Sequence, residues 1–196
     1  MELTKLEVRN MTLTKIEYMT EDLILDKNCM SLPVDIIGLA TADGFSVYAI
    51  DFTKISGEEE TKGALLVKSA NENHPSVVKQ IYFQKDLPLD ERRRVIAHEY
   101  GHYYLHKNEN DDEFYSCFRV ERFTNEEARD AAELQAELFA RCLLMPKILF
   151  MCEYGKLKEK KHLKWIGKSV ARYLSGVFNV PEVIVHERLN DLDLHA

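Results

Sequence analysis

Residues 95–106 read VIAHEYGHYYLH, and this stretch contains three of the chain's seven histidines. Two of them, His98 and His102, form the order His-Glu-x-x-His with Glu99. Positions four apart on a helix share one face, with Cβ atoms about 5–6 Å apart, so both rings can direct a nitrogen at one metal ion about 2.0–2.1 Å away. Glu99 lies about 100° around the helix from His98, where it can act as a general base on water. The stretch therefore predicts a helix that binds a metal ion and presents a catalytic carboxylate.

The alternative interpretation is a helix with buried structural histidines and no metal. Two residues argue against it. Burying Glu99 without a partner would cost several kcal/mol. Gly101, in the middle of the helix, costs about 1 kcal/mol relative to Ala, so we expect another backbone to approach the helix closely at this point.

The third histidine of the stretch, His106, lies four residues from His102 but two turns from His98, about 12 Å along a straight helix axis. One ion cannot bind all three. The longer pattern H-E-x-x-H-x-x-G-x-x-H requires Gly and His where this chain has Leu105 and Asn108. We expect His106 to support the site and not to bind the metal.

A third ligand has to come from elsewhere, because a catalytic zinc takes three protein ligands and keeps an open position. The predicted helix at about 125–144 has a stripe of small residues that lets another helix approach. The stripe consists of Ala132, Ala136 and Ala140. Glu133 lies beside it, and a carboxylate on a buried face needs a cation. Glu137, one turn on, would repel Glu133 unless a positive centre lies between them. A metal meets both needs; the other interpretation is a surface pair between Glu133 and Arg129.

The rest of the first half predicts a small, mostly antiparallel sheet. Its strands are expected at 45–52, 63–69 and 79–83, where β-branched and aromatic residues alternate between polar turns. Residues 3–28 predict a helix or an extended arm. LPVDIIGLATADGF (32–45) predicts a short helix with Pro33 in its first turn and Gly44 at its exit.

The second half predicts helices. From Leu89 the apolar residues recur every 3.6 residues and no longer every two. Residues 89–107 therefore form one predicted helix, which the acidic run 108–113 ends. Thr124 and Glu127 form a plausible capping box for the next helix, which Pro146 ends. A linker is expected at 153–161, followed by helices at 162–176 and 181–192. The predicted fold is therefore α+β, with a domain at 1–152 and a helical C-terminal appendage at 153–196 packed on it.

Composition excludes several classes of protein. A net charge of −7 argues against a general nucleic-acid coat protein. The cysteines have no C-x-x-C spacing, so neither a disulfide framework nor a cysteine zinc cluster is expected. The first residues lack the apolar run of a signal peptide, and no stretch has the length of a membrane span. We expect a protein of the cytoplasm, where thiols stay reduced.

Two segments together resemble a known family. RRRVIAHEYGHYYLH (92–106) followed by ELQAELFARCLLMP (133–146) resembles the ImmA/IrrE family of H-E-x-x-H metallopeptidases, and the resemblance covers about residues 30–150. The residues that match are His98, Glu99, Gly101, His102, Glu133, Ala136, Phe139, Ala140, Leu143, Leu144, Met145 and Pro146. The chain departs from the family at Glu137, where Asn or Asp is usual.

The resemblance implies a zincin-like fold and a gluzincin-like site. In that site His98, His102 and Glu133 bind Zn²⁺, with Mn²⁺ or another divalent metal possible, and Glu99 is the general base. The resemblance also implies a site-specific regulatory protease whose protein substrate is a helix-turn-helix repressor, often of a mobile element or a stress response.

Four further side chains are candidates for supporting roles at that site. Glu137 is a candidate for orienting a ligand histidine. Tyr103, Tyr104 and His106 are candidates for a hydrogen bond to the transition state, and the sequence does not choose among them.

Two other functions stay open. One is a zinc-bearing regulatory module that acts by contact with a repressor or DNA without proteolysis; the intact catalytic positions favour the peptidase. The other is a DNA-binding regulator that uses the basic residues between Lys156 and Arg172. A solvated basic face over a packed helical pair explains this segment better, so direct DNA binding is not favoured.

Overall fold

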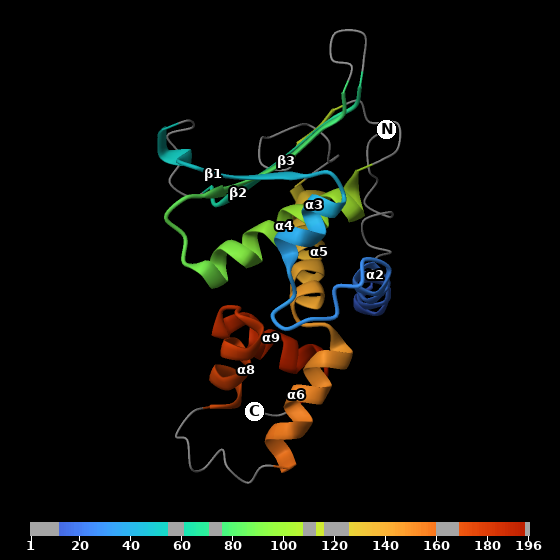
Figure 1. The fold of residues 1–196 in the computed structure, drawn as a ribbon, viewed down its shortest axis with the longest axis vertical. Helices are drawn as coiled ribbons and strands as arrows, with labels where there is room; N and C mark the ends of the chain where they lie inside the picture. Colours follow the sequence, from blue (N-terminus) through green and yellow to red (C-terminus); the bar gives the residue numbers. More distant parts are fainter. Residues whose placement is uncertain are drawn as a thin grey trace.

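A small sheet lies across one face of helix α4 (Leu89–His106), and helix α5 (Glu126–Leu144) packs against α4 from another side, as Figure 1 shows. Helices α6 (Lys147–Glu159), α8 (Val170–Phe178) and α9 (Glu182–Asp191) lie below this unit, away from the sheet (Figure 1). The computed structural model describes residues 12–54, 61–70, 76–107, 113–115, 126–159 and 169–194. The fold is α+β, as the sequence predicts.

The sheet has four described strands in the order β1-β3-β2-β4. They are β1 (Ser46–Ile50), β2 (Gly63–Lys68), β3 (Val78–Gln84) and β4 (Glu113–Tyr115). Strand β2 is antiparallel to both β3 and β4, whereas β1 runs parallel to β3. The described pairings are therefore mostly antiparallel, as predicted, and the parallel pairing of β1 with β3 makes the sheet mixed. Strand β4 begins at the residue where the sequence predicts only the end of an acidic run.

Two helices precede and flank the sheet. Helix α2 (Leu13–Asp26) has Thr12 as its N-cap, whose side chain accepts a hydrogen bond from the backbone of Lys15. Helix α3 (Ile36–Ala42) is capped by Asp35, whose carboxylate accepts from the Gly38 amide at 3.0 Å. The predicted place of Pro33 in the first turn is wrong, because Asp35 supplies the cap and the proline precedes it.

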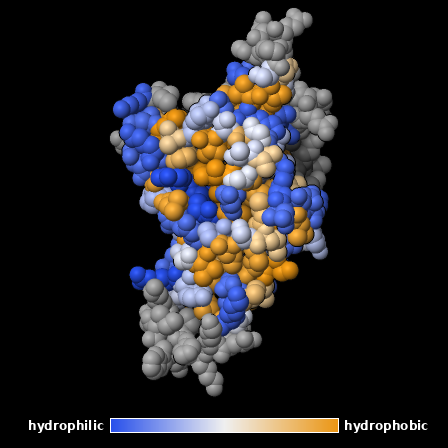
Figure 2. Space-filling view, in the orientation of Figure 1, coloured by the Kyte–Doolittle hydropathy of each residue, from blue (hydrophilic) through white to orange (hydrophobic). Residues whose placement is uncertain are grey.

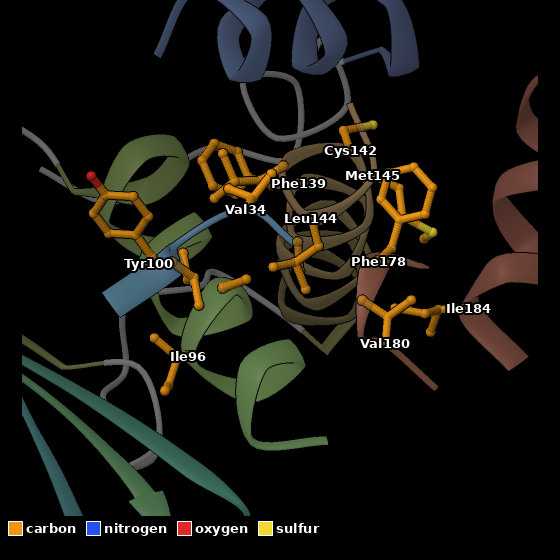
Figure 3. Packing of buried hydrophobic residues seen from close by; sticks show 14 of the residues in the cluster. Val34, Ile96, Tyr100, Phe139, Cys142, Leu144, Met145, Phe178, Val180 and Ile184 are labelled. Atoms are coloured by element: carbon orange, nitrogen blue, oxygen red, sulfur yellow. The ribbon is translucent and has the colours of Figure 1, made fainter. Parts of the chain in front are cut away.

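Helices α4 and α5 approach each other closely at Gly101. A Cβ on this glycine would lie 3.0 Å from Cδ1 of Phe139 and 3.2 Å from the carbonyl oxygen of Ala136. The alanines of the predicted small stripe are fully buried. Figure 3 shows Phe139 and Leu144 of α5 in the core with Tyr100 and Ile96 of α4. The predicted reason for a mid-helix glycine, a close backbone, is confirmed.

Helix α5 ends at Leu144, before Pro146, as predicted. Helix α6 (Lys147–Glu159) begins directly afterwards, and the Phe150 amide donates to the Pro146 carbonyl at 2.8 Å. The predicted linker is therefore wrong for residues 153–159. Proline cannot continue the preceding helix, but its fixed φ suits the start of the next one. The apolar residues that anchor α6 are buried Phe150, Tyr154 and Leu157. The capping box predicted at Thr124 and Glu127 lies outside the described side chains.

The last described helices are α8 (Val170–Phe178) and α9 (Glu182–Asp191). The prediction at 181–192 agrees with α9, whereas the helix predicted at 162–176 is described only from Val170 and continues to Phe178. Arg93 of α4 contacts the turn between them: its Nε donates to the Asn179 carbonyl at 3.1 Å and its Nη2 to the Val34 carbonyl at 2.6 Å. One buried guanidinium therefore ties the helical pair to α4 and to the chain before α3. Most of the basic run, residues 160–168, lies outside the described part of the chain. The predicted boundary between 152 and 153 falls within α6, and the division into two units stays a prediction.

Apolar residues do not single out a functional face. Figure 2 shows apolar areas over both the upper and the lower half of one face, with hydrophilic residues between them. The exposed large apolar side chains come from many elements, among them Tyr18, Ile37, Tyr48, Leu89, Leu134 and Ile148. No helix in the described ranges is both long and apolar enough to cross a membrane.

Candidate metal centre

The three predicted ligand atoms meet where α4 and α5 cross. His98 Nε2 lies 3.1 Å from His102 Nε2 and 3.2 Å from Glu133 Oε2. His102 Nε2 lies 3.5 Å from Glu133 Oε1. Two ligands on a tetrahedral ion with bonds of about 2.0–2.1 Å lie about 3.3 Å apart. The donor set and its spacing therefore fit a tetrahedral zinc ion with one position left open.

The close approach of the two helices explains this meeting. His98 and His102 share a face of α4 because they are one turn apart. Glu133 lies one turn before Ala136, the residue whose carbonyl faces Gly101. Both oxygens of the half-exposed Glu133 carboxylate face the two rings. Among the described residues, these three form a group whose donor atoms all lie within 4.8 Å of one another.

Glu137 and Arg94 hold the far side of the His98 ring. His98 Nδ1 lies 3.4 Å from Glu137 Oε2, and Arg94 Nε donates to Glu137 Oε1 at 2.7 Å. Burial by itself would raise the pKa of Glu137, but hydrogen bonds from His98 and Arg94 lower it to about 2. With Nδ1 turned to a carboxylate, the Nε2 lone pair of His98 is free for a metal. Glutamate at 137 thus reaches the ring despite the family's shorter side chain at this position.

His106 and Gln135 hold the far side of the His102 ring. His102 Nδ1 lies 3.0 Å from His106 Nδ1, and His106 Nε2 lies 3.2 Å from Gln135 Oε1. All three side chains are buried. Burial, together with the nearby His102, lowers the pKa of His106 to about 3. His106 therefore contacts Nδ1 of His102, the ring nitrogen of this predicted ligand that faces away from the metal centre.

The electrostatics of the group favour a positive charge between the carboxylates. Burial by itself would lower the pKa of His98, but hydrogen bonds with Glu133 and Glu137, and the charge of Glu99, raise it to about 10. Burial would raise the pKa of Glu133, yet its interactions with the His102 and His98 rings hold it well below its usual value. A divalent metal cation would supply positive charge at the same place.

Glu99 is buried on α4 beneath strand β2. A Cβ on Gly63, the first residue of β2, would lie 2.6 Å from Glu99 Oε1 and 2.5 Å from Cγ1 of Val95. A side chain at position 63 would push this carboxylate aside. The absence of a side chain at Gly63 therefore leaves the space that the carboxylate of Glu99, the predicted general base, occupies.

The two tyrosine candidates point elsewhere. The Tyr103 hydroxyl accepts from Lys79 Nζ at 2.8 Å, and the Tyr104 hydroxyl donates to the Asp43 carboxylate. Tyr100 donates to the same carboxylate at 2.5 Å. Of the four supporting candidates, the structure brings Glu137 and His106 to the ligand histidines and does not bring Tyr103 or Tyr104. The reason is angular: positions 103 and 104 lie about 100° and 200° around the helix from His102.

Three residues that contact this centre were not predicted from the sequence: Arg94, Gln135 and Gly63. Arg94 carried a usable signal, because it lies four residues before His98 and thus on the same face. Gln135 and Gly63 carried none, because their partners lie 29 and 36 positions away, at His106 and Glu99.

Comparisons with known proteins identify the family of this chain. A family model described as the IrrE N-terminal-like domain, peptidase family M78, matches residues 49–190. The chain is also 27% identical over 119 residues to Metallopeptidase ImmA of Bacillus subtilis (strain 168). That alignment covers 61% of this chain and 61% of the relative, so the chain matches less than two thirds of the relative's length. The residues that the family model matches, 49–190, include every residue of the metal centre. The chain belongs to the ImmA/IrrE family of M78 metallopeptidases, whose model is the IrrE N-terminal-like domain.

Proposed function

We propose that this protein is a zinc-dependent endopeptidase with a zincin-like arrangement and a regulatory role, and that it cleaves a helix-turn-helix transcriptional repressor. The observation that carries the peptidase proposal is the convergence of His98, His102 and Glu133 at distances of 3.1–3.5 Å, with Glu99 on the same helix. The repressor as substrate follows from the family resemblance of the two motif helices.

A divalent metal, zinc foremost and manganese as an alternative, would be held by His98, His102 and Glu133. When bound, it polarises a peptide carbonyl and makes water more acidic. Glu99 takes a proton from the attacking water and passes it to the leaving amine. Glu137 and His106 keep the two rings oriented.

The direct test is cleavage of candidate repressors by wild type and by Glu99→Gln, followed by mass spectrometry of the fragments. Repressors encoded next to the gene are the first candidates. Gln has nearly the shape of Glu but cannot take the proton, so we expect zinc content to stay and cleavage to fall by at least about 100-fold. A chelator should abolish cleavage by wild type, and added zinc should restore it.

The same experiment separates the peptidase from a module that acts by contact. A contact regulator would still bind and inactivate the repressor as Glu99→Gln, with no fragments from wild type. Equal cleavage by wild type and Glu99→Gln would overturn the proposed role of Glu99.

The compartment proposed is the cytoplasm. The described cysteines Cys29, Cys142 and Cys152 are free thiols, and reducing compartments keep thiols in this state.

A further inference from the structure

The buried pair His106 and Gln135 forms a chain of hydrogen bonds that ends on a ligand histidine. The chain runs from Gln135 Oε1 to His106 Nε2 over 3.2 Å, and from His106 Nδ1 to His102 Nδ1 over 3.0 Å. His102 Nε2, at the other end of its ring, is the metal-facing atom. All three side chains are less than a tenth exposed, so water does not compete for these contacts.

Such a chain has only two directions, because a neutral imidazole donates from one nitrogen and accepts at the other. In the first direction His102 donates from Nδ1 to His106 Nδ1, and His106 donates from Nε2 to an oxygen of Gln135. This direction leaves a lone pair on His102 Nε2. In the second direction the Gln135 amide nitrogen donates, both rings reverse, and His102 carries its hydrogen on Nε2, where it blocks a metal.

We propose that Gln135, acting through His106, is a positioning residue that fixes His102 in the tautomer with hydrogen on Nδ1. The amide oxygen of Gln135 faces His106 in the structure, and this orientation selects the first direction. The residue at 135 thus sets the metal affinity of a ring it does not touch. This inference rests on the proposed metal site and deepens it.

Position 106 offers a matched test, because Asn and Leu have nearly the same shape and Asn alone places an acceptor near the position of His106 Nδ1. We expect His106→Leu to raise the zinc dissociation constant 10- to 100-fold. We expect His106→Asn to stay within about threefold of wild type. Zinc affinity is measured by competition with a chromophoric chelator, and circular dichroism verifies the fold. Equal losses in both variants would show that packing alone matters and would overturn the proposal, as would unchanged affinity in His106→Leu.

Position 135 offers the second test, which needs no metal. Long-range ¹H–¹⁵N correlation spectra of the metal-free protein report which nitrogen of each histidine carries hydrogen. We expect the Nδ1–H form of His102 in wild type and a mixture of both tautomers in Gln135→Met, which keeps the shape of Gln but has no amide. A hydrogen on Nε2 of His102 in the wild-type protein would refute the proposed direction of these hydrogen bonds, whether or not the His106 variants fold.

The two readouts separate this inference from the proposed function. If wild type binds no zinc, the proposed function fails, and the tautomer spectra still show whether the hydrogen bonds run from His102 through His106 to Gln135. If wild type binds zinc and cleaves a repressor, the proposed function stands. If Gln135→Met then shows the wild-type tautomer of His102 and the wild-type zinc affinity, only the positioning role of Gln135 is refuted.

Discussion

The start of strand β2 and the predicted general base are in contact: a Cβ added to Gly63 would lie 2.6 Å from Oε1 of Glu99. The sheet thus contributes to the site through the absence of a side chain. Position 63 controls the base without touching the metal ligands, and this separation can be tested.

Gly63→Ala is expected to lower kcat/KM for repressor cleavage about 100-fold, because a shift of about 1 Å in a catalytic group can cost that much. Zinc affinity should stay at the wild-type value, since the ligands are untouched. Gly155→Ala is the matched control: a Cβ there meets nothing within 4 Å. The control should keep its activity and gain roughly 0.5–1 kcal/mol in free energy of unfolding. Full activity in Gly63→Ala would show that the base tolerates displacement.

Arg94→Met is expected to weaken zinc binding about tenfold, within the range seen when outer partners of metal ligands are removed. The arginine neutralises Glu137, which in turn faces His98. Arg92→Met is the control, because Arg92 lies on the same helix but contacts the Leu87 carbonyl and the Phe83 ring. Chelator competition at pH 7.5 measures both variants. If Arg94→Met binds zinc as tightly as Arg92→Met and wild type do, Glu137 orients His98 without Arg94.

Zinc binding at pH 7 is expected to release a proton from His98. The pKa of this ring is raised to about 10 in the metal-free protein, so the ring is protonated at neutral pH, whereas a metal needs its neutral form. Zinc affinity should therefore rise about tenfold per pH unit between pH 7 and 8. Calorimetry in two buffers of different ionisation enthalpy counts the protons released.

The same shift has a consequence for the metal-free protein. A raised pKa means that His98 stabilises the fold fully below about pH 6.5, its unfolded value, and loses this contribution as the pH rises towards 10. The midpoint of thermal unfolding without metal should fall between pH 7 and 9, and it should fall less in His98→Gln. A flat profile in wild type would contradict the raised pKa.

Arg188→Met is expected to cost about 3–5 kcal/mol of unfolding free energy, because it removes the nearer of the two cations that face the buried Glu17 carboxylate and leaves Lys147 at 3.6 Å. Arg188 is fully buried, lies 2.8 Å from Glu17 and donates from Nε to the Met145 carbonyl at 3.1 Å. The double variant Glu17→Leu/Arg188→Met should recover part of the loss. Arg172→Met, at an exposed position of α8, should change stability by less than about 0.5 kcal/mol. Urea denaturation measures all four proteins, and an unchanged stability in Arg188→Met would show that Lys147 and water are enough to stabilise the Glu17 carboxylate.

Local spacing was enough to predict the helix α4 and the shared face of His98 and His102. Backbone geometry within one helix fixes these directions whatever packs against it. The sequence also predicted the end of α5 before Pro146, because proline lacks the backbone N–H and its ring clashes with the preceding turn of a helix. The linker predicted at 153–161 is wrong for residues 153–159, because a proline that ends one helix can also begin another. Buried Phe150, Tyr154 and Leu157 anchor the helix that follows it.

Glu133 as the third ligand could be predicted from its place beside the alanine stripe, but its meeting with the histidines depends on how closely Gly101 lets α5 approach. Only the tertiary structure turned Tyr103 and Tyr104 towards Lys79 and Asp43, paired β1 in parallel with β3, and brought Gln135 and Gly63 to the site. The physical reason is the same in each case. The sequence of one element fixes which side chains share a face, whereas the partner of that face is chosen by many weak apolar contacts summed over the whole core.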